Sequence, residues 1–219
     1  MAAQQREVKD FHRVKMQDFG VLEITQGEQE SLIVEAGEEW LDKIYTQVRD
    51  GTLILRVGKS WLERLEAGLH SSLSRPPIRY RVTVKDLSAV LVAGFGRVHV
   101  GELATERLAL NLSGAGDVSL ESLTAEHFEV QLTGGGRIEA AGKVKQQGVT
   151  LSGAGRYAGG SLESQQTRVT MSGAGSATVW ALHDLDVTLS GVGSVEYYGD
   201  PKVKQSISGL GSIKHLGKH

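Results

Sequence analysis

The segment Leu110-Asn-Leu-Ser-Gly-Ala-Gly116 decides the fold, because close copies of it recur through the second half of the chain. Successive first glycines of the repeated Gly-x-Gly pairs are 20, 20, 19, 20, 18 and 18 residues apart. The seven pairs are Gly94/Gly96, Gly114/Gly116, Gly134/Gly136, Gly153/Gly155, Gly173/Gly175, Gly191/Gly193 and Gly209/Gly211. A constant period near 20, with alternating apolar residues on both sides of each pair, is typical of a solenoid. We therefore predict seven stacked turns.

Aligning the repeats on their glycines predicts which side chains face the core, because neighbouring residues of a strand face opposite ways. Apolar residues alternate before each glycine pair, as at Leu110/Leu112, and again after it, as at Val118/Leu120. Leu103, Leu123, Leu162 and Leu182 form a third apolar column, with Lys143 as the exception in its turn. Each strand is expected to pair in parallel with its equivalent one turn later.

Both glycines of every pair are interpreted as structural corners, since glycine turns sharply without a clash at Cβ. A hydroxyl precedes all but one of the pairs and is expected to bond the backbone of the corner or the neighbouring hydroxyl. This column comprises Ser113, Thr133, Ser152, Ser172, Ser190 and Ser208. A dinucleotide-binding loop is excluded, because its fingerprint needs a helix after the glycines and strands follow here.

The first half of the chain is also predicted to be mainly β. Residues 19–25, 31–35 and 78–84 have strand patterns, and residues 44–57 are interpreted as a hairpin around Asp50-Gly51 or as strands of two adjacent turns. Residues 35–43 are interpreted as a loop or a single helical turn, and 59–69 as a short amphipathic helix. One domain is expected over 14–216, with irregular turns over 14–86, an insertion over 59–70 and regular repeats over 87–216. Residues 1–13 are expected to be a flexible segment.

Composition limits the classes of function. The net charge is −2, which gives no general attraction for nucleic acid, and the chain has no cysteine for disulfides, thiol catalysis or metal thiolates. The seven histidines show no metal-binding spacing. No run of 18 apolar residues exists that would predict a membrane span, and residues 1–11 lack the apolar region of a signal peptide. No catalytic residue, cofactor or metal is predicted.

Three carboxylates, Asp117, Glu139 and Glu196, are the candidates to compare with the acidic groups of polysaccharide-active enzymes. They fall in different columns or distant turns, so we expect them to be solvated. His183-Asp184, at a turn, is a weak candidate for a metal site. Trp180, Tyr197 and Tyr198 are expected to cover the last turns.

The chain resembles the bacterial family of putative autotransporter adhesin head domains, the GIN domain. The resemblance rests on Phe19-Gly-Val-Leu-Glu-Ile-Thr-Gln-Gly27, Leu41-Asp-Lys-Ile44, Asp50-Gly-Thr-Leu53 and the repeated Leu-Ser-Gly-x-Gly-x-Val units. It implies a right-handed parallel β-helix of an exported protein, in the periplasm or at the cell surface, whose signal has been removed. A cytoplasmic location is the alternative.

Together these observations predict a non-enzymatic cell-envelope or surface scaffold that binds a protein or glycan partner. Two alternatives stay open: a structural solenoid that self-assembles through its ends, and a polysaccharide-active enzyme. Any functional site is expected on the variable outward columns or at the ends of the coil, where Lys214, His215 and Lys218 would discourage edge pairing.

Overall fold

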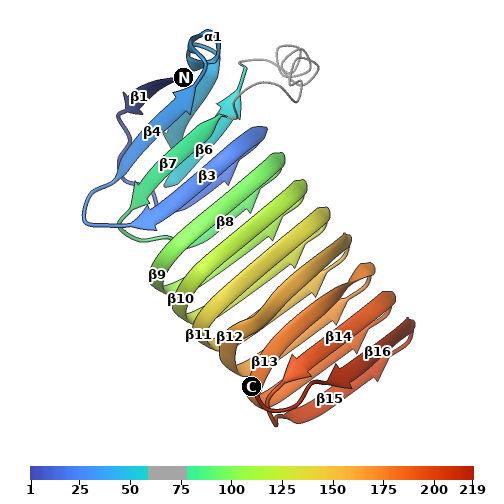
Figure 1. Ribbon diagram of the computed structural model, residues 1–219. Coiled ribbons are helices and arrows are strands. Elements are labelled where there is room, and N and C mark those ends of the chain that lie inside the picture. Colours follow the sequence, from blue (N-terminus) through green and yellow to red (C-terminus); the bar gives the residue numbers. More distant parts are fainter. Residues whose placement is uncertain (59–77) are drawn as a thin grey trace.

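The computed structural model describes residues 1–58 and 78–219 and shows a β-solenoid of about six turns (Figure 1). The described part has one short helix, α1 (Glu38–Leu41). The predicted β-helix is confirmed, and it has about six turns where seven were predicted. The helix predicted over 59–69 lies outside the described residues.

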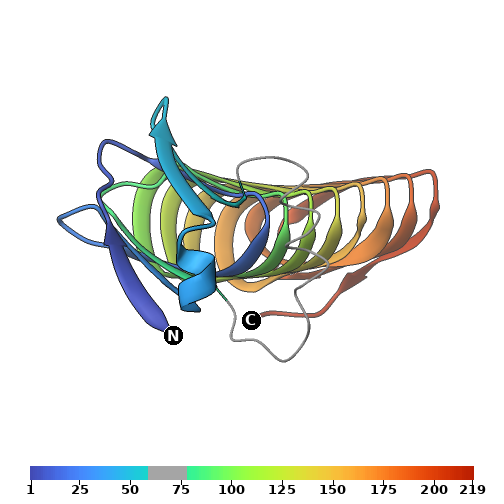
Figure 2. The ribbon, with the colours of Figure 1, turned by 90° about the horizontal axis from the view of Figure 1, so that it is seen from above.

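The regular part consists of long strands, each of which makes almost a complete turn. They are β9 (Phe95–Leu112), β10 (Ala115–Leu132), β11 (Gly135–Leu151), β12 (Ala154–Met171) and β13 (Ala174–Leu189). Every neighbouring pair is parallel. Seen from above, the successive turns follow one another across the picture and form a flattened tube (Figure 2). One face contains the residues that follow each glycine pair, and the other contains those that precede the next pair.

The glycine pairs stack directly on one another. Gly116 pairs with Gly96 on one side and with Gly136 on the other. A Cβ atom built on Gly114 would collide with the carbonyl oxygen of Gly94, one turn below. Close backbone approach, more than the φ angle, therefore requires glycine at the first position of each pair.

The N-terminal strands complete the first turn of the coil. β2 (Arg13–Met16) pairs in parallel with β8 (Ala89–Val92), and β3 (Phe19–Gln26) pairs in parallel with β9. Phe19 and Gly20 lie opposite Phe95 and Gly96. An eighth corner, at 18–20, thus stacks on the glycine column across more than 70 residues of sequence.

Antiparallel strands close this N-terminal end. On one face, β7 (Arg79–Val84) pairs with β3, β4 (Ser31–Ala36) adds antiparallel to β7, and β1 (Ala2–Arg6) adds to β4. On the other, β6 (Thr52–Val57) pairs with β2, and β5 (Ile44–Arg49) adds antiparallel to β6. The predicted hairpin is confirmed. The flexible segment predicted over 1–13 is wrong at Ala2–Arg6, which is held by a full ladder to β4.

The helical turn α1 carries Trp40 into the capped end. Trp40 is buried, and its ring meets the Phe19 ring edge-on at 6.0 Å between centroids. The guanidinium of Arg6 donates to the carbonyl oxygen of Leu41 at 2.9 Å, which ties α1 to β1. The contact between the Trp40 and Phe19 rings and the hydrogen bond to the Leu41 carbonyl oxygen together hold α1 over the N-terminal end of the core, which removes apolar surface from water.

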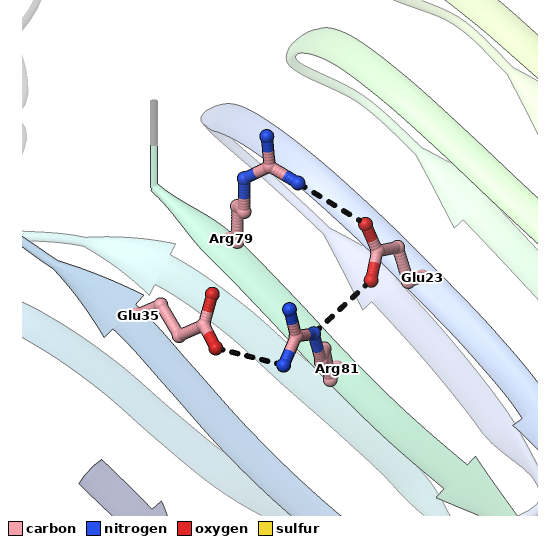
Figure 3. Close-up of polar contacts among 4 residues, drawn as sticks. All are labelled: Glu23, Glu35, Arg79 and Arg81. Atoms are coloured by element: carbon pink, nitrogen blue, oxygen red, sulfur yellow. Dashed lines mark hydrogen bonds and ion pairs between the residues drawn. The ribbon is translucent and has the colours of Figure 1, made fainter. Parts of the chain in front are cut away.

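An ion network fixes the register of the cap (Figure 3). The Glu23 carboxylate on β3 forms ion pairs with the guanidinium groups of Arg79 and Arg81 on β7, with nitrogen–oxygen distances of 3.4 Å and 3.2 Å. Arg81 also reaches Glu35 on β4 at 2.9 Å. These contacts join the last parallel strand to the first antiparallel one, so a slip of β4 along β7 would separate the charges.

The C-terminal end has no comparable cover in the described residues. β14 (Val192–Tyr198) and β15 (Lys202–Ile207) make the last full turn, and β16 (Leu210–His215) adds a half-turn on β14 alone. Every residue of β15 is exposed. One edge of β15 and one edge of β16 therefore have no pairing strand.

The second glycine of four pairs requires a correction, because it is not a corner. The chain bends at the first glycine, and the second one is already the second residue of the strand that follows. The four second glycines in β12, β13, β14 and β16 do not have a positive φ angle; they are Gly155, Gly175, Gly193 and Gly211. The interpretation of these four residues as corners is therefore wrong.

Close stacking explains why glycine nevertheless stands at these strand positions. A Cβ atom on Gly175 would collide with the carbonyl oxygen of Gly155, and one on Gly193 with that of Gly175. Gly211 meets the Gly193 carbonyl oxygen in the same way. A Cβ atom on Gly155 would instead collide first with the side chain of Leu132 in the core. The second glycines thus make room for neighbouring turns and do not turn the chain.

The core columns largely follow the predicted alternation, as Leu110, Leu112, Val118 and Leu120 are all buried. The third column needs two corrections. Leu123 and Leu162 both pair with Gly142 rather than Lys143. Leu182 is only half-buried, because a register shift between β12 and β13 puts Ala181 inside the core instead.

Candidate functional site

A polar groove of about 600 Å³ lies on the outer side of the face that precedes the glycines. It crosses β11, β12, β13 and β15 and extends to the exposed edge of β15. Its lining consists of Glu129, Gln146, Gln147, Gly148, Val149, Thr150, Gln166, Thr167, Arg168, Thr170, Asp184, Leu185, Asp186, Lys202, Val203 and Lys204. The groove is thus lined by outward residues of consecutive turns together with parts of inward ones such as Gln147 and Thr167.

Gly148 creates the hollow. It lies between Glu129 and Arg168 in one outward column, which continues to Asp186 and Lys204. A Cβ atom on Gly148 would collide with the Glu129 carboxylate, so the glutamate side chain lies across the glycine. Any other residue at 148 would displace Glu129 and fill the groove.

A second column supplies ordered amides along the groove. The side-chain nitrogen of Gln146 donates to the Gln166 oxygen at 3.3 Å, and the Gln166 nitrogen is 3.5 Å from the Asp184 carboxylate. Lys202 follows Asp184 in register. One amide group from each of two turns is therefore held in a defined orientation, about 4.8 Å from the next.

The charges of the groove are balanced. Three carboxylates, Glu129, Asp184 and Asp186, share the lining with three cations, Arg168, Lys202 and Lys204. Donors and acceptors alternate from turn to turn, and the lining has no aromatic ring. Such a surface suits a ligand with many hydroxyl groups and little net charge more than a polyanion.

A buried polar network lies beneath the groove. Gln147 and Thr167 occupy an inward column whose neighbours are Phe128 on one side and Leu185 on the other. The Gln147 amide donates to the Tyr157 hydroxyl, and Ser164 bonds Thr167 and the carbonyl oxygen of Trp180, the latter at 2.8 Å. Burial raises the pKa of Tyr157 well above its usual range, which keeps the phenol neutral.

This network connects the groove to the core, because Gln147 and Thr167 contribute to both. Its members satisfy one another, so they stabilise the floor of the groove rather than offer free groups. The sequence signal was available: Gln147 and Thr167 interrupt a column of Leu108, Phe128 and Leu185. That column was not among the three predicted.

The glycine pairs and the predicted hydroxyls lie elsewhere, along one edge of the flattened tube. All six hydroxyl-column residues are exposed. Ser113 Oγ donates to the Val92 carbonyl at 3.4 Å, and Ser190 Oγ to the Met171 carbonyl at 3.5 Å. These are long bonds to the turn below.

The three carboxylates weighed from the sequence do not converge. Asp117 lies in register between Arg97 and Arg137, and Glu139 pairs with Arg137 at 2.6 Å. Glu196 lies three turns from Glu139 in the same column. Among the described residues, no group of three or more His, Asp or Glu side chains could hold a metal ion.

The C-terminal aromatic residues pack against the chain end. The rings of Trp180 and His219 stack at 4.2 Å, and those of Tyr197 and His215 at 4.9 Å. His215 Nε2 lies 2.7 Å from the Gly199 carbonyl oxygen. These rings therefore contact one another outside the groove.

A family description matches this architecture. The sequence model of the "Putative auto-transporter adhesin, head GIN domain" family matches residues 10–201. The chain belongs to the GIN-domain family. The match spans the N-terminal cap except β1, the long strands of the coil and the groove-bearing strands β11 to β13, so the GIN domain accounts for nearly the whole chain.

Solved structures share the fold of this GIN domain. A putative adhesin from Bacteroides fragilis is 26% identical, with a TM-score of 0.89 over 98% of this chain and 96% of that one. A protein described as a putative lipid binding protein, from Parabacteroides distasonis, is 20% identical with a TM-score of 0.72, and also covers 98% and 96%. A putative adhesin from the same organism is 17% identical, with a TM-score of 0.71 over 98% of this chain and 96% of that one. The last two likenesses concern the fold alone.

A comparison with curated proteins finds no match. Within residues 1–58 and 78–219, no helix has the length and apolar character needed to cross a bilayer.

Proposed function

We propose that this GIN domain is a non-enzymatic, adhesin-like binding module of an exported or surface protein, and that its polar groove binds a glycan. The adhesin-type family supports the location and the general role. The observation that carries the glycan assignment is the groove itself, in which amides, hydroxyls, carboxylates and cations repeat at the turn spacing with no net charge.

The repeat suits an extended sugar chain. Successive turns place equivalent polar groups about 4.8 Å apart, a spacing close to that of sugar rings in an extended oligosaccharide. Gln146 and Gln166 present amides that can donate and accept, while Asp184 and Arg168 bind hydroxyls through charge-assisted hydrogen bonds. Thr150 and Thr170 add hydroxyls at one side of the groove.

The carboxylate arrangement favours binding over hydrolysis. Asp184 and Asp186 project side by side from one strand, whereas the acid and base of a glycosidase flank the scissile bond from opposite sides. Glu129 lies three turns from Asp186 in its column, roughly 14 Å away at the turn spacing.

A glycan array probed with the purified GIN domain tests this function. We expect selective binding of neutral or zwitterionic glycans, and about tenfold weaker binding for Arg168→Ala and Asp184→Asn, because each loses a charge-assisted hydrogen bond. Arg107→Ala is the matched control, since Arg107 is an exposed arginine on the same face outside the groove.

Two results would overturn the proposal. One is an array with no bound glycan, or binding that Arg107→Ala weakens as much as Arg168→Ala does. The other is the appearance of new reducing ends when the bound glycan is incubated with the protein, which would support the polysaccharide-active alternative instead.

A further inference from the structure

The open end of the solenoid gathers exposed apolar side chains. Of the large hydrophobic residues that are exposed in the described part, four lie in the last turn and the half-turn above it. They are Val192, Val203, Ile207 and Leu210, with exposed fractions between 39% and 79%. Val203 and Ile207 belong to inward columns and are exposed because no strand of residues 1–58 or 78–219 pairs with the outer edge of β15.

The last half-turn covers only one of the two faces, because β16 pairs with β14 and no described strand pairs with the outer edge of β15. We call this uneven end, formed by β15 and β16, the step. Just after β16 the chain continues alongside the end of β14, as the Leu216 amide donates to the Tyr197 carbonyl and the Gly199 amide donates to the Gly217 carbonyl. The outer edge of β15 therefore has no pairing strand among the described residues, whereas the equivalent edge of β14 is paired with β16.

The charge of the step is positive. Its outward residues are Lys202, Lys204 and Lys214, and no ion pair involves them within the described residues. One turn below, they are in register with Asp184, Asp186 and Glu196 respectively. In these columns the side-chain charge therefore changes from negative in the turn below to positive in the last turn. A further strand with acidic side chains at the same positions would continue this alternation of charge.

We infer that the edge of β15 binds an extended acidic segment of a partner protein by strand addition. Its backbone would pair with the free edge, its acidic side chains would lie over Lys202 and Lys204, and its apolar side chains would cover Val203 and Ile207. A second copy of this chain is a poorer occupant, because end-to-end contact of two such steps would oppose lysine to lysine.

The chain itself supplies a probe for this edge. Residues 184–189, Asp-Leu-Asp-Val-Thr-Leu, already pair with the other edge of β15 and have the required alternation of acidic and apolar side chains. A labelled peptide of this sequence is expected to bind the protein saturably in fluorescence anisotropy, and more weakly as salt rises. Hydrogen exchange should slow at 202–207 when the peptide is bound.

A charge exchange makes the test specific. Lys202→Glu/Lys204→Glu should bind the peptide about tenfold more weakly, and should instead bind a peptide with both aspartates replaced by lysine. Lys9→Glu/Lys85→Glu is the matched control, with the same change in net charge on exposed residues away from the step.

Ile207→Ser separates this site from the groove, because Ile207 is not among the groove-lining residues. This substitution should weaken binding of the acidic peptide and leave binding of the glycan unchanged. The inference is overturned if the acidic peptide does not bind, if the control pair loses as much affinity as Lys202→Glu/Lys204→Glu, or if the charge exchange fails to restore binding. Dimers in sedimentation that the peptide displaces would also overturn it, in favour of a second copy.

Discussion

The two ends of the solenoid finish the same pair of sheets in different ways. At the N-terminal end, antiparallel strands and a helical turn cover the apolar inward columns, so Leu32, Leu53 and Trp40 are buried. At the C-terminal end the outermost described strands, β15 and β16, pair in parallel like the rest of the coil, and their inward positions include Gln205 and His215, both exposed. A capped end needs a change of strand direction, whereas an open end relies on charge and polarity to limit edge pairing.

The largest expected effect on the free energy of unfolding comes from truncating a leucine at the capped end, compared with the same truncation at the open end. Leu53→Ala in the capped end should lower the free energy of unfolding by about 2–5 kcal/mol, because Leu53 is 0% exposed and its loss leaves a cavity. Leu210→Ala at the open end should change it by less than about 0.5 kcal/mol, since Leu210 is 79% exposed. Urea unfolding followed by circular dichroism measures both, and equal losses would mean that the ends do not differ.

Corner substitutions should show a smaller contrast. Gly134→Ala is expected to destabilise by about 1–3 kcal/mol, because its Cβ would meet the Gly114 carbonyl between two fixed turns. Gly209→Ala meets the Gly191 carbonyl in the same way, but β16 can move outward because nothing in the described residues lies above it. Thermal unfolding of both variants tests this, and an equal or larger loss for Gly209→Ala would show that the last half-turn is rigid.

The smallest effect concerns the cap's ion network. Arg81→Ala should cost about 1 kcal/mol, because Arg81 bridges Glu23 and Glu35 at a half-exposed position. The difference from the unmodified protein should shrink in high salt. Lys214→Ala is the control at the open end, and a salt-independent loss for Arg81→Ala would assign its role to packing.

Much of this fold could be predicted from the glycine period and the alternating apolar residues, since both are local in sequence. The same period could not separate the bend at Gly153 from the strand position at Gly155, because close stacking demands glycine at both. The pairing of Phe19-Gly20 with Phe95-Gly96 was missed, because it joins segments separated by the whole cap. A signal existed, as both begin with Phe-Gly and apolar residues follow at equivalent positions.

The groove was harder to predict, because it depends on which residues lie side by side between turns of unequal length. Gly148 lacks a repeat partner in sequence that would mark it, and it becomes a hollow only when Glu129 and Arg168 are placed on either side of it. The half-turn step at β15 likewise depends on β16 pairing with β14 alone, which the glycine period does not reveal.

Hydrogen exchange of the native protein, followed by mass spectrometry, tests the contrast between the ends most directly. Exchange of strand amides reports local opening, which has the lowest free energy where packing and pairing are least complete. If the N-terminal end is capped and the C-terminal end is open, amide exchange should be slow in β3, β4 and β7 and fast in β15 and β16. Protection of 202–215 equal to that of 79–84 would contradict it.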